Sequence, residues 1–202
     1  MNNRAVPKIA IALLVVGVLG IAATTVLQRS STPVLQGRAP DAMDAMFIEE
    51  MVPHHQDAID MAEMALGRSE RPEIMQLAED VIRTQSAEID QMRAWYREWY
   101  AADVPESGGR PGMMGRGSPG MMRGMMWQGT VDLEALEEAD EFDKVFLEAM
   151  VPHHEMGVMM SRMAGSVTRR PELRELTRSI ERAQRQEIAD MRRWYEEWYG
   201  RR

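Results

Sequence analysis

Apolar residues recur at helical spacing between residues 41 and 66. At 100° per residue, with Met51 as the origin, apolar and histidine side chains share one face, while acidic and amide side chains take the opposite face. Pro53 interrupts the run of backbone donors, so it either kinks this helix or begins a new one. Ser69, three residues before Pro72, is a candidate N-cap for the following helix.

A second amphipathic helix is predicted over residues 71–101. Its inward-facing positions combine apolar side chains with Gln85, Glu88 and Met92. The two predicted helices form a helical hairpin over residues 41–101.

The hairpin pattern occurs a second time, offset by 99 residues without a gap, and Thr168 repeats the position of Ser69. Two copies with so long a period indicate a duplicated domain half rather than a solenoid. The second hairpin is expected over residues 131–202, with helices at about 131–165 and 169–200. Two hairpins with one apolar stripe each predict an all-α four-helix bundle. The sequence leaves open whether they pair within one chain or exchange between chains of a homo-oligomer.

Residues 1–30 are predicted to be a membrane anchor or a signal segment. Ile9 to Leu27 is a run of 19 residues without charge, flanked by basic residues, which is typical of a membrane-spanning helix. A signal peptide cleaved near residues 20–23 is the alternative. Either prediction places the rest of the chain outside the cytoplasm, anchored to the membrane or secreted, in the periplasm or at the cell surface. Residues 31–40 are predicted to be a short tether.

Between the hairpins, residues 102–130 hold eight of the 15 glycines and show no apolar periodicity, which predicts a flexible linker. Its paired methionines suit transient capture of Cu(I), the alternative being a merely flexible, oxidisable segment. These methionines are Met113, Met114, Met121, Met122, Met125 and Met126.

Composition narrows the function classes. The net charge of -8 and the absence of a basic stripe argue against a nucleic-acid partner. The chain has no cysteine, so disulfides, thiolate metal sites and cysteine catalysis are excluded. Its 20 methionines either fill the core or supply the thioether ligands that select Cu(I).

All four histidines lie in two copies of Met-Val-Pro-His-His. Di-iron bundles place Glu-x-x-His on two helices and a single Glu on each of the other two. Here methionine replaces the glutamate of that motif, and a thioether shifts the preference from iron towards Cu(I). The principal predicted metal ligands are Met51, His54, His55, Met150, His153 and His154.

Further donors fall on the same helices. Met61, Met64, Met160 and Met163 follow the histidine motifs and are secondary candidates. Glu88, Glu187, Met92 and Met191 lie on the partner helices. For the two glutamates, hydrogen bonding between helices is an equally good interpretation.

The motif Phe47-Ile-x-x-Met-Val-Pro-His-His55, continued by Gln85-x-x-Glu88-Ile89-x-x-Met92, resembles the bacterial family called domain of unknown function 305. The resemblance covers about 41–100 and 140–199, and it implies a ferritin-like fold and, from some exported members, copper binding and copper tolerance. The second half departs from the motif, because Gly157, Val158, Met159 and Ser161 replace Ala58, Ile59, Asp60 and Ala62. This departure leaves the histidines intact, but it leads us to expect that the two sites are unequal.

We therefore expect a copper-binding protein outside the cytoplasm that sequesters or delivers Cu(I) and is not an enzyme. One alternative is a metal-dependent oxidoreductase using Glu88 and Glu187 with the histidines, which needs an open coordination position. The other is a metal-free helical interaction module, whose stability metal would not change.

Overall fold

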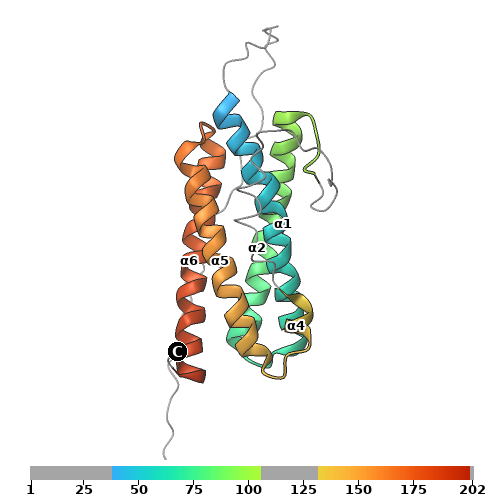
Figure 1. Ribbon diagram of the computed structural model, residues 1–202, viewed down its shortest axis with the longest axis vertical. Helices are drawn as coiled ribbons and strands as arrows, with labels where there is room; N and C mark the ends of the chain where they lie inside the picture. Colours follow the sequence, from blue (N-terminus) through green and yellow to red (C-terminus); the bar gives the residue numbers. More distant parts are fainter. Residues whose placement is uncertain (1–37, 106–131, 201–202) are drawn as a thin grey trace, which may run out of the picture. The chain divides into compact units, whose positions relative to one another are not determined.

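The computed structural model describes residues 38–105 and 132–200. Within these ranges the regular structure is helical, which confirms the all-α prediction (Figure 1). The predicted targeting segment over residues 1–30 and nearly all of the Gly/Met-rich linker lie outside the described residues. Of the helices in the described ranges, none has the combination of length and apolar character that crossing a membrane requires.

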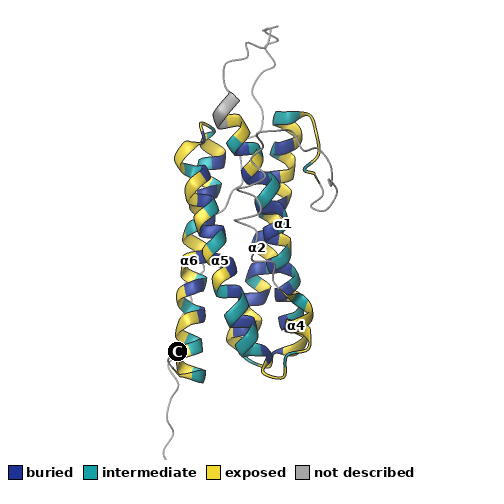
Figure 2. Ribbon diagram, viewed as in Figure 1, coloured by how far each residue is buried: buried dark blue, intermediate teal, exposed yellow. Residues whose placement is uncertain are grey.

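The described helices form two hairpins. α1 (Arg38–Arg68) packs along α2 (Pro72–Tyr100), and α5 (Phe142–Val167) packs along α6 (Pro171–Tyr199). The hairpins meet chiefly through α1 and α5, which run in opposite directions side by side (Figure 1). Buried residues lie on the inward faces of these helices (Figure 2).

Both prolines of the histidine motifs lie inside a continuous helix. Pro53 is part of α1 and Pro152 is part of α5. Of the two alternatives for Pro53, the start of a new helix is therefore wrong, because the preceding turns already belong to α1. Each proline removes one backbone donor from the middle of its helix, two residues after a buried methionine, Met51 or Met150.

The turns of the two hairpins share one hydrogen-bonding arrangement, which differs from the predicted N-cap. The N-cap residues are Arg71 and Arg170, in extended conformation, with proline in the first helical turn. Ser69 Oγ instead accepts a hydrogen bond from the backbone N–H of Arg71 at 3.1 Å, and Thr168 Oγ1 does the same for Arg170 at 3.2 Å. The hydroxyls therefore shape the turn before the helix rather than capping the helix itself.

The predicted helix over residues 131–165 is interrupted. A short helix, α4 (Leu133–Glu137), begins at Asp132, whose side chain accepts from the backbone N–H of Ala135 at 2.9 Å. A turn separates it from α5. The break arises because α4 folds back on the core: it buries Leu136, and Arg68 of α1 donates to the carbonyls of Glu137 and Ala139.

The core consists of two apolar clusters. One combines the C-terminal half of α1 and the N-terminal half of α2 with the start of α5, the end of α6 and α4. The other combines the opposite halves of the same long helices. The clusters follow the duplication, and between them each long helix contributes polar residues near its middle.

Candidate metal centre

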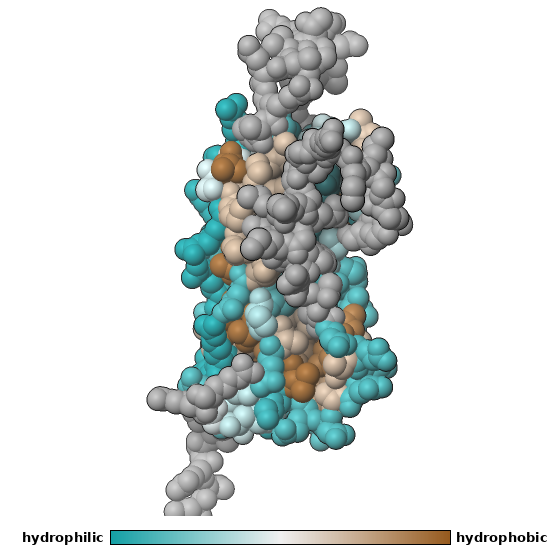
Figure 3. Space-filling model, viewed as in Figure 1, coloured by the Kyte–Doolittle hydropathy of each residue, from teal (hydrophilic) through white to brown (hydrophobic). Residues whose placement is uncertain are grey.

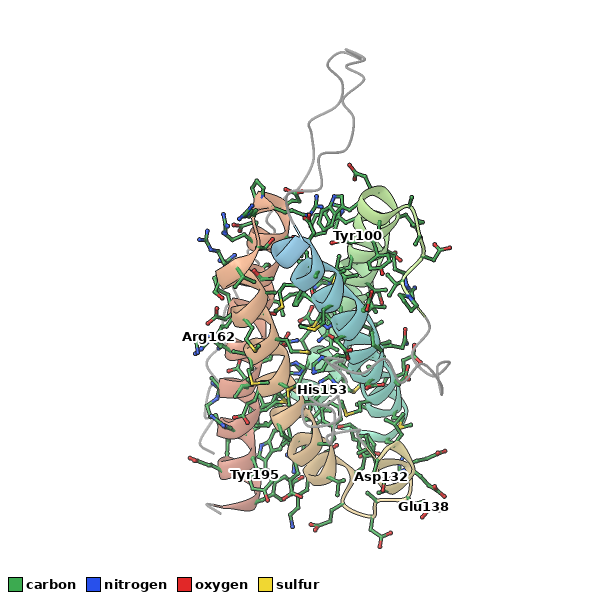
Figure 4. The ribbon with its side chains drawn as sticks, turned by 45° about the horizontal axis from the view of Figure 1, so that its top comes forward. Tyr100, Asp132, Glu138, His153, Arg162 and Tyr195 are labelled. Carbon is green, nitrogen blue, oxygen red and sulfur yellow. The ribbon has the colours of Figure 1, made fainter. Side chains whose placement is uncertain are left out.

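A layer of polar side chains separates the two apolar clusters. We call it the histidine layer, and each of the four long helices contributes to it near its midpoint. Its members are His54 and His55 from α1, Gln85 and Glu88 from α2, His153 and His154 from α5, and Gln184 and Glu187 from α6. The two predicted histidine motifs thus meet in one place, at the centre of the bundle, where His153 lies between the helices (Figure 4).

The contact at the middle of this layer joins the two halves of the duplication. The rings of His54 and His153 stack, with centroids 3.8 Å apart and an interplanar angle of 26°. His54 Nε2 lies 3.1 Å from the backbone carbonyl oxygen of His153. Since a carbonyl oxygen only accepts, Nε2 of His54 carries the proton and its Nδ1 keeps a lone pair.

The other two histidines, His55 and His154, are each held by a glutamate of the partner helix. His55 Nε2 donates to Glu88 Oε2 at 2.9 Å, and His154 Nε2 donates to Glu187 Oε2 at 2.8 Å. In both pairs the imidazole is fully buried and the carboxylate is 19% exposed. Such a carboxylate fixes the tautomer and the ring orientation of a histidine, as it does behind metal-bound histidines. The glutamates therefore act here as hydrogen-bond partners between helices, one of the two interpretations left open by the sequence.

The Nδ1 atoms of all four histidines are buried, and none has a hydrogen-bond partner within the described part of the chain. His153 Nε2 is likewise unpaired there. Buried polar atoms in folded proteins are nearly always paired, so a set of unpaired ring nitrogens in one layer requires an explanation. Neutral imidazole nitrogens with free lone pairs are the form that binds soft and borderline metal ions.

Burial keeps the central pair neutral. Desolvation, followed by repulsion from His154 and His55, lowers the pKa of His153 to about 3. Desolvation, followed by repulsion from His153, holds the pKa of His54 well below its ordinary value. At neutral pH both rings are uncharged, so no proton competes with a metal ion at these nitrogens.

Thioethers border the histidine layer on both sides. Met51 and Met92 are fully buried in one apolar cluster. Met61, Met150 and Met191 are fully buried in the other. Met160 and Met64 pack at the edges of these clusters and are partly buried.

The remaining predicted ligands do not join the layer. Met163 is 39% exposed on α5. The linker methionines lie outside the described residues. Over residues 41–105 and 132–200, no three His, Asp or Glu side chains form a group suited to holding a metal ion. A metal ion bound in the layer would thus take thioether ligands together with the imidazoles.

The sequence did not single out Gly157 as a structural requirement. A Cβ atom at this position would lie 2.2 Å from Gln184 Oε1, so the glutamine amide occupies the space that a side chain would need. The first half has Ala58 at the equivalent position. The replacement of Ala58 by glycine was the signal that could have revealed this contact.

The two hairpins differ in the polar groups in and beside the layer. In the second half, Ser161 Oγ and both amide atoms of Gln184 are buried and lack partners among the described residues. In the first half, Ala62 stands in place of the serine, and of the two amide atoms of Gln85 only Oε1 is buried without a partner among the described residues. Both duplicated halves therefore keep their histidines, but the polar groups around those histidines differ between the halves.

Solved structures with the same arrangement of helices include CopM in several forms. CopM in the Cu(I)-bound form is 43% identical, covers 78% of this chain and 98% of its own, and gives a TM-score of 0.66. CopM in the Cu(II)-bound form is 46% identical, with coverage of 77% and 97% and a TM-score of 0.66. A DUF305 protein from Streptomyces coelicolor is 27% identical over 79% of this chain and 95% of its own, with a TM-score of 0.66.

An uncharacterized protein of Acanthamoeba polyphaga mimivirus is 39% identical over 51 residues, which are 25% of this chain and 34% of the viral protein. The shared segment thus spans about a third of that relative. The family model described as domain of unknown function (DUF305) matches residues 44–201, most of the chain and both hairpins. The chain therefore belongs to the DUF305 family.

Proposed function

We propose that this protein binds copper outside the cytoplasm, holding Cu(I) in the histidine layer for sequestration or delivery. The observation that carries the proposal is the set of four buried imidazoles whose Nδ1 atoms have no partner among the described residues. Imidazoles bordered by buried thioethers form a donor set that favours Cu(I) over harder ions.

The similarity to CopM supports the choice of metal. CopM has been solved in Cu(I)-bound, Cu(II)-bound and Ag-bound forms. Ag(I) and Cu(I) are both soft, so a site that accepts both agrees with thioether and imidazole ligands. His54, His55, His153 and His154 are the ligands that we assign first, with no more than two of them to one ion, because no three of these side chains are grouped to hold a metal. Met51 and Met150, three residues before the first histidine of each motif, are the thioethers that we assign with them. Met61, Met92 and Met191 are the other thioethers that border the layer.

The predicted targeting segment supports the location. An uncharged run over residues 9–27 would carry the bundle across a membrane, whether it is then cleaved or retained. The similar protein of Streptomyces coelicolor bears the description of a secreted protein.

The test is a Cu(I) titration of the full chain under reducing conditions, against a chelator of known affinity. It compares the wild type with the variant His54→Ala, His55→Ala, His153→Ala and His154→Ala, whose folding is checked by circular dichroism. Two half-variants, H54A/H55A and H153A/H154A, serve as matched controls for each other. We expect the tight binding to be lost in the fourfold variant and weakened in both half-variants.

The other outcomes contradict the proposal. Binding that survives in full in the fourfold variant would assign the copper to methionines elsewhere in the chain. Absence of binding by the wild type, with a melting temperature unchanged by Cu(I), would favour the metal-free interaction module, because a ligand of the native state must raise its stability.

A further inference from the structure

A group of methionines outside the histidine layer lies along the edge where α1 and α5 meet. It comprises Met43 and Met46 of α1 and Met156, Met160 and Met163 of α5, and we call it the methionine seam. Met46 and Met163 are exposed, and the other three are partly buried.

The stacked histidines show which side of each helix faces the other. On α1, with the buried Met51 as the origin, His54 lies about 60° to one side, and Met43 and Met46 lie about 80° and 140° to that same side. Because His54 stacks on His153, this is the side of α1 that faces α5. Met43 and Met46 therefore line the outer edge of the contact between the two helices.

The same geometry holds on α5. With Met150 as the origin, His153 lies about 60° to one side, and Met160, Met156 and Met163 lie about 80°, 120° and 140° to that side. Both sets of thioethers thus border one seam. Met160 packs against the cluster that contains Phe47 and Met51, which places it beside the first half of α1.

The antiparallel register brings the two sets to the same height. His54 lies opposite His153, so Met43 and Met46 lie across from residues 160–164 at a rise of 1.5 Å per residue. Met156 lies one helical turn nearer the histidine layer than Met160. Figure 3 shows tan, moderately hydrophobic surface where α1 and α5 lie side by side.

Packing does not require these methionines. At the opposite end of the bundle, the duplication places Phe142 and Val145 where the seam has Met43 and Met46. It places Asp57, Met61 and Met64 where the seam has Met156, Met160 and Met163. The same helix contact thus forms with two thioethers at one end and five at the other.

We propose that the methionine seam is a second soft-metal site, which takes Cu(I) or Ag(I) through thioether sulfurs at the protein surface. Unlike the buried layer, it offers ligands that an ion reaches directly from solvent or from a donor. Thioethers without imidazole or carboxylate bind monovalent soft ions selectively over divalent ones. The seam goes beyond the function proposed above, because it does not depend on the histidines.

The test uses the full chain labelled with ¹³C at the methionine methyl groups, with Ag(I) as a redox-inert probe. The seam variant is M43L/M46L/M156L, since leucine keeps the apolar volume but lacks sulfur. The matched control is M75L on α2, because Met75 is 38% exposed and the substituted Met46 is 36% exposed. We expect Ag(I) to shift the seam methyl resonances in the wild type, in M75L and in the fourfold histidine variant. We expect M43L/M46L/M156L to lose one or more Ag(I) equivalents.

Two results would overturn the seam site. One is that the seam resonances stay in place at saturating Ag(I), or that the seam variant keeps every equivalent. The other is that these resonances shift with protein concentration in the absence of metal, which would make the seam a contact between copies of the chain. Failure of the histidine layer alone has a different signature: the fourfold histidine variant then binds as much Ag(I) as the wild type, with the seam shifts unchanged.

Discussion

His54 stacks on His153, its own counterpart 99 residues along the chain. The contact places a pair of neutral rings where the two hairpins meet, while His55 and His154 are each held by a glutamate of the partner helix in their own hairpin. The layer therefore combines a central pair without acidic partners and two flanking imidazoles whose orientation is fixed from the partner helices.

The glutamates Glu88 and Glu187 should tune metal affinity through the histidines that they hold. Changing both to glutamine removes the charge behind His55 and His154, and loss of such a partner typically weakens metal binding by about 10–100-fold. Competition with a Cu(I) chelator measures the effect. The exposed pair Glu73 and Glu172, changed to glutamine in the same way, is the control. Equal affinity of both double variants would show that Glu88 and Glu187 have no such role.

Gly157 should not tolerate a side chain. In Gly157→Ala the new Cβ atom collides with Gln184 Oε1, so we expect the protein to be destabilised by about 1–3 kcal/mol in urea unfolding. Gly67→Ala is the control, because a Cβ atom there has no described atom within 4 Å and alanine favours the helix. G67A should match or exceed the wild type in stability. Adding Gln184→Ala to G157A should recover part of the loss, and a fully stable G157A would contradict the contact.

The metal-free protein should lose stability as pH falls from about 6.5 towards 3. His153 has a pKa of about 3 in the folded protein, against about 6.5 when unfolded, so in this window only the unfolded chain gains the proton. His54, whose pKa is also lowered, adds to the same slope. Replacing both by glutamine should flatten the dependence of the unfolding free energy on pH. An unchanged slope would mean that these rings are not held neutral.

Asp57 should change the pH dependence of stability in the direction opposite to that of the histidines. Burial, followed by the charge of Asp60, raises the pKa of Asp57 to about 6. The folded protein therefore binds the proton at a pH where the unfolded chain does not, and stability falls as pH rises from about 4 to 6. In Asp57→Asn this decrease should disappear, and the variant should be more stable than the wild type at pH 7. Asp90→Asn, at an exposed position of α2, is the control for the loss of one charge.

Two arginines should hold the hairpins together. The guanidinium of Arg71 lies 3.9 Å from the ring centre of Trp198 and pairs with Asp143 at 3.1 Å. Its counterpart Arg170 lies 4.0 Å from the ring centre of Trp99. Because lysine cannot stack and pair in the same way, R71K/R170K should lose about 1–2 kcal/mol in urea unfolding. Lysine at the exposed Arg83, whose partner Asp80 lies on the same helix, should change little.

Periodicity and the repeat were sufficient to predict the helices and the buried faces, because a constant spacing of apolar residues specifies both. The same inward arc placed Glu88 near the histidines. Periodicity carries no register between helices, so the stacking of His54 on His153 could not be read from it. The break after α4 was also missed, since it depends on Leu136 folding back onto the core and on Arg68 binding the turn.

The difference between Ala58 and Gly157 has a consequence for how such a bundle can evolve. Two identical hairpins that associate as separate chains must carry the same residue at every equivalent position. Once both hairpins belong to one polypeptide, each copy can mutate alone while the shared histidines stay fixed. The glycine against Gln184, the hydroxyl of Ser161 and the added methionines of the second copy are substitutions of this kind. Covalent tandem linkage thus allows one half to specialise without changing the other.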